Sequence, residues 1–259
     1  MSPKKKQIIY GIFYFLVLIF IVFLVTKPSL KKVPSCFDKI QNGNEEGIDC
    51  GGSCTPCYIK EAKPLNVLGE PLIFKNIASG RLFALINIQN PNENVGSHIF
   101  YYSVDFYDKD NNLVGKVNST DNIFPVESKY IVVKYSGTAY DIGRIEQLKV
   151  SFDNIVWARS IEFLKPTLSF IKEPNVSIKD EFIIIEGKIA NQSIFNVPQI
   201  SIIGVLKDKY GNPLFIGDTV SNSIPAGESY DFSIFIPSSF VNPDYLKGMK
   251  SEVFLSVKE

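Results

Sequence analysis

Histidine is almost absent from this chain, since His98 is the only one in 259 residues. A metal cage built from several histidines is therefore excluded, and a serine or cysteine triad would have to use His98 itself. The sequence also has no G-x-S-x-G nucleophile elbow, no P-loop and no G-x-G-x-x-G dinucleotide fingerprint. We therefore expect a protein that is not an enzyme, with no catalytic residues. An unrecognised envelope hydrolase is kept as an alternative that loss of a measured activity in His98→Ala would favour.

An excess of charge of one sign is missing as well. The chain has 27 basic and 27 acidic side chains and a formal net charge of +0. Its basic tracts lie only at the flanks of one apolar stretch. Because nucleic-acid binders usually present a wide basic surface, we exclude nucleic acid as a partner.

Long hydrophobic runs are few, and the one that stands out is Ile8 to Val25. At helical rise this run reaches roughly 27 Å, close to the thickness of a bilayer's hydrocarbon core. It is longer than a secretory h-region, usually about 7 to 15 residues, and no small-residue cleavage site follows it. We therefore predict an uncleaved transmembrane signal anchor at residues 7–26.

Charge alone does not fix the orientation of this anchor, because lysines 4–6 on one flank nearly balance lysines 27, 31 and 32 on the other. The cysteines that follow decide it, since paired thiols persist in an oxidising compartment. The prediction is a protein that crosses the cell membrane once. Residues 1–6 form a cytoplasmic tail, residues 27–35 a linker, and the carboxy-terminal domains are extracytoplasmic.

Cysteine is scarce too, and its four copies all lie in residues 36–57, which are too short to build a core of their own. Cys36, Cys50, Cys54 and Cys57 have the spacing C-x13-C-x3-C-x2-C. We predict two disulfides in one of three connectivities, which the sequence does not choose. Structural zinc is a weaker alternative, because the spacing lacks paired C-x2-C knuckles and an exported site oxidises thiols.

The same segment also carries oxygen ligands of the kind that calcium prefers, between glycines that allow the chain to turn. A calcium site is therefore an open alternative, although the spacing is not that of an EF-hand. The other reading is that these are polar turn residues that need no ion. The residues concerned are Asp38, Asn42, Asn44, Glu45 and Asp49.

The segment resembles a short motif of exported surface proteins, C-x-D, N-G-x-E and D-C-G-G-x-C-x-x-C. The matching positions are Cys36, Asp38, Asn42, Gly43, Glu45, Asp49, Cys50, Gly51, Gly52, Cys54 and Cys57. The resemblance supports export and implies no role for the motif.

After the anchor, alternation with period two replaces helical periodicity. Phe100, Tyr102, Val104 and Phe106 point one way, whereas the residues between them point the other way. Short alternating runs separated by turn residues predict antiparallel β-sandwiches, with Trp157 as a core anchor. The other runs are Leu82–Ile88, Tyr130–Tyr135, Leu148–Phe152, Phe182–Ile189, Phe232–Ile236 and Val253–Val257.

The two halves of this β region repeat each other at an offset of about one hundred residues. Such a period predicts a duplicated domain, here residues 64–164 and 166–259, each with its own core. The offset places Asn111 on Gly211, where a hairpin needs a residue that tolerates positive φ. The residues that mark the repeat are Asn90, Asp108 and Pro125 in the first copy and Asn191, Asp208 and Pro225 in the second.

Asn90, Pro91, the stretch V-D-F-Y-D at Val104 to Asp108, and Pro125 resemble FxLYD domains and, more loosely, LEA-like immunoglobulin-type sandwiches. The second copy departs from this pattern, because Val205 to Lys207 stand where the first has Asp105 to Tyr107. The resemblance implies surface modules without enzymatic activity. No cofactor is expected, apart from the calcium alternative and the weaker zinc alternative.

The fold class we predict is all-β: two tandem antiparallel β-sandwich, Ig-like domains after one transmembrane helix and a small disulfide-rich segment. The predicted function is to present these modules for binding or for envelope structure. Besides the membrane, the expected partner is a protein or a cell-wall glycan, or another copy at an exposed sheet edge. An accessory subunit of a membrane complex is the alternative, although Gly11 is the only small residue in the span. Unchanged function with a polyleucine span would favour a simple anchor.

Overall fold

The structure is a computed structural model that describes residues 3–26 and 35–258. Helix α1 (Pro3–Thr26) contains the apolar run, and an 18-residue window within its segment Pro3–Leu24 has a mean hydropathy of 2.6. Among the described residues it is the one helix whose length and composition suit a membrane span, a test that a signal sequence also passes. The predicted linker lies outside the described residues except for Ser35.

The chain divides into two compact units, residues 1–57 and 58–259. The first unit contains α1 and the cysteine segment. A short helix, α2 (Cys57–Lys60), begins at the last cysteine, and all the long β-strands belong to the second unit.

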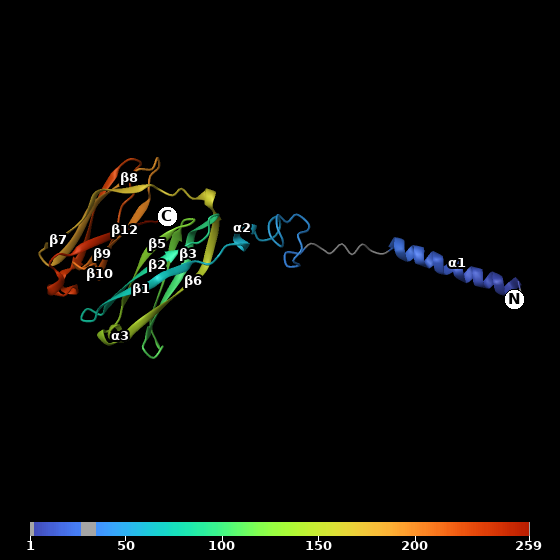
Figure 1. The fold of residues 1–259 in the computed structure, drawn as a ribbon, viewed down its shortest axis with the longest axis horizontal. Helices are drawn as coiled ribbons and strands as arrows, with labels where there is room; N and C mark the ends of the chain where they lie inside the picture. Colours follow the sequence, from blue (N-terminus) through green and yellow to red (C-terminus); the bar gives the residue numbers. More distant parts are fainter. Residues whose placement is uncertain (1–2, 27–34, 259) are drawn as a thin grey trace. The chain divides into compact units, whose positions relative to one another are not determined.

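The first β-module has two three-stranded antiparallel sheets (Figure 1). Its strands are β1 (Asn66–Asn76), β2 (Arg81–Gln89), β3 (Val95–Asp108), β4 (Leu113–Ile123), β5 (Ser128–Ser136) and β6 (Ile145–Arg159). One sheet has the order β1-β2-β5 and the other β4-β3-β6. Helix α3 (Ala139–Arg144) joins β5 to β6 and starts with a capping box between Thr138 and Asp141.

The second β-module repeats this arrangement (Figure 1). Its strands are β7 (Leu168–Lys179), β8 (Phe182–Asn191), β9 (Gln199–Lys207), β10 (Pro213–Val220), β11 (Ser229–Pro237) and β12 (Lys250–Lys258). They form the sheets β11-β8-β7 and β10-β9-β12, so each strand of the first module has a counterpart at the same place. The strands predicted from alternation lie within β2, β3, β5, β6, β8, β11 and β12.

Each module buries an apolar layer between its two sheets. In the first module Leu82 and Ile86 of β2 face Val104 and Phe106 of β3, all fully buried, and the partly buried Trp157 packs against this core. Ile183 and Ile185 of β8, with residues of β9 and β11, form the corresponding layer in the second module. The predicted all-β sandwich fold class is confirmed.

The edge strands β1 and β7 carry matching interruptions. The pairing of β1 with β2 shifts register between Leu68 and Leu72, across Pro71. The pairing of β7 with β8 shifts between Lys172 and Asn175, across Pro174. Because proline removes a backbone donor and a bulge bends the strand, both edges offer a poor template to an added strand.

The two modules pack against each other through sheet faces that point away from their own cores. Phe83 and Leu85 lie on the outer face of β2, and both join the apolar cluster of the second module. The ring of Phe83 lies 5.0 Å from that of Phe215 in β10. From the opposite sheet, Phe254 of β12 lies 4.1 Å from Tyr130 of β5. The outer face of β1-β2-β5 therefore packs against the outer face of β10-β9-β12.

A buried ion pair lies beside this interface. Lys129 Nζ is 2.9 Å from Asp121 Oδ1, and both side chains are only 2% exposed. The same ammonium donates to the carbonyl oxygen of Asn122 at 2.8 Å. Lys258, near the end of β12, places its Nζ 3.5 Å from the other oxygen of Asp121. The last strand of the second module is thus held to the first by charge as well as by apolar contact.

The repeat diverges where this interface requires it. Ile203 of β9 pairs with Phe254 on one side and Asp218 on the other, and these two residues contact Tyr130 and Lys134 of the first module. The residue at the same place in β3 is Ser103. Val205 likewise stands where β3 has Asp105. The difference between the two copies at these positions is therefore explained by burial of this face against the first module.

Candidate functional site

The four cysteines form two disulfides, which confirms the predicted pairing and supplies the connectivity that the sequence left open. Cys36 bonds Cys54, with Cα atoms 5.5 Å apart, and Cys50 bonds Cys57, with Cα atoms 4.8 Å apart. The two loops overlap, so the segment is stapled along most of its length. With all four sulfurs in disulfides, the thiolates that structural zinc requires are not present.

The five residues considered for calcium act mainly as turn and loop acceptors. Asp38 Oδ1 accepts from the backbone N–H of Ile40, and Asp49 Oδ1 accepts from that of Lys39, both at 2.9 Å. Glu45 Oε2 accepts from the backbone N–H groups of Asn42 and Asp49 at 3.1 and 3.3 Å. Asn44 Oδ1 accepts from the hydroxyl of Ser53. These contacts explain the residue types without an ion, and calcium binding stays a prediction.

Among the described residues, the side chains of a different set with metal-ligand atoms lie close together: Cys36, Glu45 and Cys54. Both sulfurs of that set belong to one disulfide, and Glu45 Oε1 lies 3.4 Å from Cys54 Sγ. A disulfide sulfur is no thiolate ligand. The set is therefore a packing contact of the staple.

The paired glycines of the motif have a steric explanation. Gly52 adopts a φ of +58°, and a Cβ there would lie 2.2 Å from the carbonyl oxygen of Asn44. At Gly51, with φ +80°, a Cβ would lie 2.5 Å from Cβ of Glu46. Side chains rarely adopt such φ values, and here there is also no space for them. The two glycines of D-C-G-G thus allow two segments of the stapled loop to pass close to each other.

Asn90 and Asn191 hold equivalent loops together in the two modules. Both are fully buried. Asn90 Nδ2 donates to the carbonyl oxygens of Val95 and Phe124 at 2.8 and 3.0 Å. Asn191 Nδ2 donates to Phe195 and Ile224 over the same distances, and also to the carbonyl oxygen of Pro225 at 3.1 Å. Each amide therefore ties the loop after one strand, β2 or β8, to the loop that follows another, β4 or β10.

Replacing Asn191 by alanine is expected to lower the free energy of unfolding by about 2–3 kcal/mol. The substitution removes three hydrogen bonds and takes the side-chain donor from the carbonyl oxygen of Phe195. The carbonyl oxygens of Ile224 and Pro225 keep backbone donors. A buried polar group left unsatisfied costs about 1–3 kcal/mol. Chemical denaturation monitored by circular dichroism measures the change. Asn196→Ala is the matched control, because Asn196 lies at the surface and its side chain accepts one exposed hydrogen bond. Equal costs at the two positions would contradict the assigned role.

Asp108 and Asp208 organise equivalent hairpins. Asp108 Oδ1 accepts from the backbone N–H groups of Asp110 and Asn112 at 3.0 and 2.9 Å. Asp208 Oδ1 accepts from Tyr210 and Asn212 at 2.8 and 2.9 Å. As the repeat predicted, Asn111 and Gly211 both have positive φ, +61° and +94°. The two aspartates therefore have the same structural role.

These hydrogen bonds favour the charged form of both carboxylates. Donation from the Asn112 backbone N–H lowers the pKa of Asp108, and donation from the Asn212 side chain lowers the pKa of Asp208. Arg144, whose Nη1 lies 3.5 Å from Asp108 Oδ2, acts in the same direction. Hairpin chemistry thus accounts for these acidic residues.

The lowered pKa values predict a loss of stability in acid. Both groups contribute stability fully above their ordinary pKa of about 3.9, and that contribution disappears as the pH falls through the lower folded values. We expect the denaturation midpoint to drop below about pH 4, and to drop less steeply in the variant Asp108→Asn/Asp208→Asn. Denaturant titrations between about pH 5 and pH 2.5 measure this. Identical pH profiles for the two proteins would contradict it.

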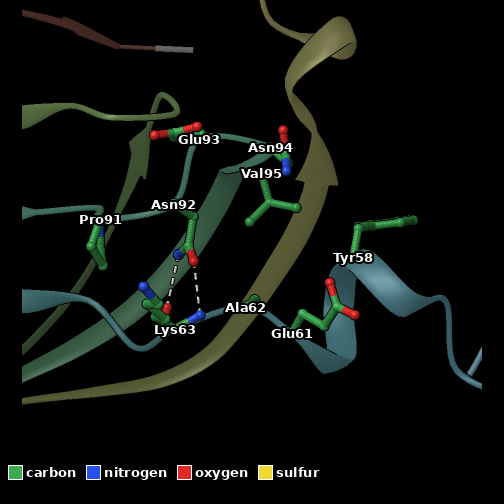
Figure 2. Close-up of a pocket in the computed structure, with 9 residues that line it drawn as sticks. All are labelled: Tyr58, Glu61, Ala62, Lys63, Pro91, Asn92, Glu93, Asn94 and Val95. Atoms are coloured by element: carbon green, nitrogen blue, oxygen red, sulfur yellow. Dashed lines mark hydrogen bonds between the residues drawn. The ribbon is translucent and has the colours of Figure 1, made fainter. Parts of the chain in front are cut away.

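A polar pocket of about 340 Å³ lies at the end of the first module where the chain enters it (Figure 2). Asn92 reaches across its floor, accepting from the backbone N–H of Lys63 and donating to the carbonyl oxygen of Lys63, each at 2.8 Å. Figure 2 shows the carboxylates of Glu61 and Glu93 on different sides of the pocket, pointing away from each other. A pair of carboxylates working as acid and base would have to converge, so this pocket supports clamping of the entering chain better than catalysis.

His98 lies near the start of β3, as predicted, and its ring stacks on that of Phe163 with centroids 4.2 Å apart. Phe163 belongs to the segment that joins the modules. This arrangement gives His98 a packing role beside the module junction.

Comparison with known proteins adds little to these sites. No family model matches the sequence, and no curated protein matches it. Similar solved structures include the exo-chitosanase CsxA of Amycolatopsis orientalis, at 12% identity and TM-score 0.27, and a β-glucuronidase of glycoside hydrolase family 2, at 12% identity and TM-score 0.19. The alignments cover 73% and 81% of this chain but 25% of each enzyme. The chain thus spans about a quarter of the length of these enzymes, and likeness at this level carries no argument about function.

Proposed function

We propose that this protein is a single-pass membrane protein that holds two β-sandwich modules outside the cell and acts by binding rather than by catalysis. The observation that carries the proposal is the close succession of helix α1 and a segment with two disulfides. An apolar helix of this length suits a bilayer, and disulfides persist in oxidising compartments. Together they favour a chain whose cysteines and modules are exported.

The contact between the modules supports a presenting role. The Phe83–Phe215 and Tyr130–Phe254 contacts and the Lys129–Asp121 pair hold the modules in one orientation. Surfaces on the two modules therefore keep a fixed spacing. Fixed spacing lets two weak contacts act together on one partner, because the second contact is intramolecular.

Peptide mapping of the protein from native membranes tests the proposal. Under non-reducing conditions with free thiols blocked, the expected result is linked peptides for Cys36–Cys54 and Cys50–Cys57, in a protein that resists alkaline carbonate extraction. The matched control is the chain from residue 27 onward, exported by a cleavable signal peptide, which should be released. Free thiols in the native protein, or its release by carbonate, would overturn the proposal.

A further inference from the structure

The first module keeps one outer sheet face that differs in chemistry from the module interface. Tyr101, Ser103, Asp105 and Tyr107 of β3 point away from the core, because Phe100, Val104 and Phe106 between them are fully buried. In the second module the equivalent face of β9 is apolar and packs against its neighbour. Ser103 is buried at 6% exposure, and Asp105 forms an ion pair with Lys116. Tyr101 differs from both, because it is a large aromatic residue that is 46% exposed.

Tyr101 lies in a hollow of about 420 Å³ on this face. The strand register puts Thr120 of β4 on one side of Tyr101 and Asp153 of β6 on the other. The next row holds Asn118, Ser103 and Ser151 in the same order. The hollow therefore combines one exposed aromatic ring with hydroxyl and amide groups on two adjacent rows. We call it the tyrosine hollow.

Strand β6 bends beside the tyrosine hollow. Its pairing with β3 shifts register between Ile99 and Tyr101, and Asn154 in the bulge has a φ of +46°. Such bulges re-aim side chains and occur next to binding sites more often than elsewhere. Here the bulge brings Asp153 and Asn154 into the lining of the hollow.

The described lining of the tyrosine hollow has no cluster of charges of one sign. In the row beyond Ser103, Lys116 Nζ lies 3.1 Å from Asp105 Oδ1, so these two charges offset each other. Asp153 is the one acidic side chain among the described residues that line the hollow. With hydroxyl and amide groups, one carboxylate and no basic side chain in this described lining, the hollow favours a ligand without negative charge that is rich in hydroxyl groups and presents a flat apolar side to Tyr101. Sugar rings have these properties, since their C–H faces stack on aromatic rings and their hydroxyls bond to amide and carboxylate oxygens.

We propose that the tyrosine hollow is a binding site for a neutral glycan chain. The ring of Tyr101 stacks on one sugar, and Asn118, Thr120 and Asp153 bond to its hydroxyl groups. This proposal rests on the proposed function, because it takes the glycan to lie outside the cell. Tyr107 extends the same face six positions along β3, roughly 20 Å from Tyr101 at strand rise, so a longer chain reaches both rings.

Binding of the full chain in detergent to an array of neutral plant, fungal and bacterial oligosaccharides tests the site. We expect at least one oligosaccharide series to bind, and its affinity to fall about tenfold in Tyr101→Ala and by less than threefold in Tyr101→Phe, which keeps the ring. Tyr107→Ala should weaken binding of long chains but not of short ones. Tyr210→Ala is the matched control, because Tyr210 is a 76% exposed tyrosine in a hairpin of the other module. It should bind as the parent does.

Three results would overturn the proposal. The first is that no neutral oligosaccharide binds, and the second is that binding survives Tyr101→Ala in a variant that melts as the parent does. The third concerns Asn118, which is exposed and begins the sequence Asn-Ser-Thr, an acceptor for N-glycosylation. A glycan attached to Asn118 in protein from native membranes would fill the hollow and exclude a ligand. The array uses purified protein, so a negative result would count against the glycan site without bearing on the proposed membrane topology.

Discussion

Lys129→Met is expected to lower the free energy of unfolding by about 3 kcal/mol. The substitution leaves Asp121 buried at 2% exposure without its 2.9 Å partner, and it removes the donor to the carbonyl oxygen of Asn122. Breaking a buried pair usually costs about 3–5 kcal/mol, because the remaining charge is uncompensated. Lys258, 3.5 Å from the other carboxylate oxygen, keeps the expected cost at the lower end. Urea denaturation at neutral pH measures it.

The double variant Lys129→Met/Asp121→Leu separates the cost of leaving one buried charge unpaired from the net contribution of the ion pair to stability. Removal of both charges is expected to recover most of the loss, since apolar residues of similar size often replace buried pairs without penalty. Lys188→Met is the surface control, because its 3.1 Å partner Asp231 is 77% exposed. That change should cost less than about 1 kcal/mol. A single Lys129 variant as stable as the Lys188 variant would contradict the role of the buried pair.

Leu85→Asp is expected to separate the modules and to cost at least about 3 kcal/mol. Leu85 is 4% exposed and lies in the apolar cluster shared by both modules, so a carboxylate there has no partner. We expect a larger radius of gyration by small-angle scattering, and faster amide exchange at the outer-facing residues of β2 and β9. Leu85→Met, which conserves volume, should change stability by less than about 1.5 kcal/mol. An unchanged radius in the aspartate variant would show that the modules are not held by this face.

The strands with strict alternation could be predicted from the sequence, because one buried face imposes period two. β1, β4, β7, β9 and β10 were not predicted from alternation. Pro71 and Pro174 interrupt β1 and β7, and β4 is an edge strand with mostly polar residues. Helix α3 has only six residues, but its capping box at Thr138 and Asp141 was a readable signal.

The module interface was missed although the sequence contains its signal. The run Ile200 to Leu206 in β9 is apolar at nearly every position, and so is Leu82 to Ile88 in β2. A continuous apolar run is typical of a strand that is buried on both faces, whereas an exposed sandwich face alternates. The pairing of β2 and β9 itself is a long-range contact that no local pattern specifies.

The repeat signature was found from the sequence, but its function is structural. Asn90, Asn191, Asp108 and Asp208 were singled out, and each ties a loop or hairpin by hydrogen bonds. The disulfide connectivity was not predictable, because spacing alone allows three pairings. The tyrosine hollow depends on a bulge in β6 and on strand register, and neither is visible in composition.

Protease treatment of intact cells that carry the protein with a carboxy-terminal tag tests the central claim most directly. We expect external protease to remove the tag from unbroken cells, while a cytoplasmic protein in the same cells stays intact. A tag that is digested only after the cells are broken would place the modules inside. That result would contradict the membrane-anchored, extracytoplasmic function proposed for this chain.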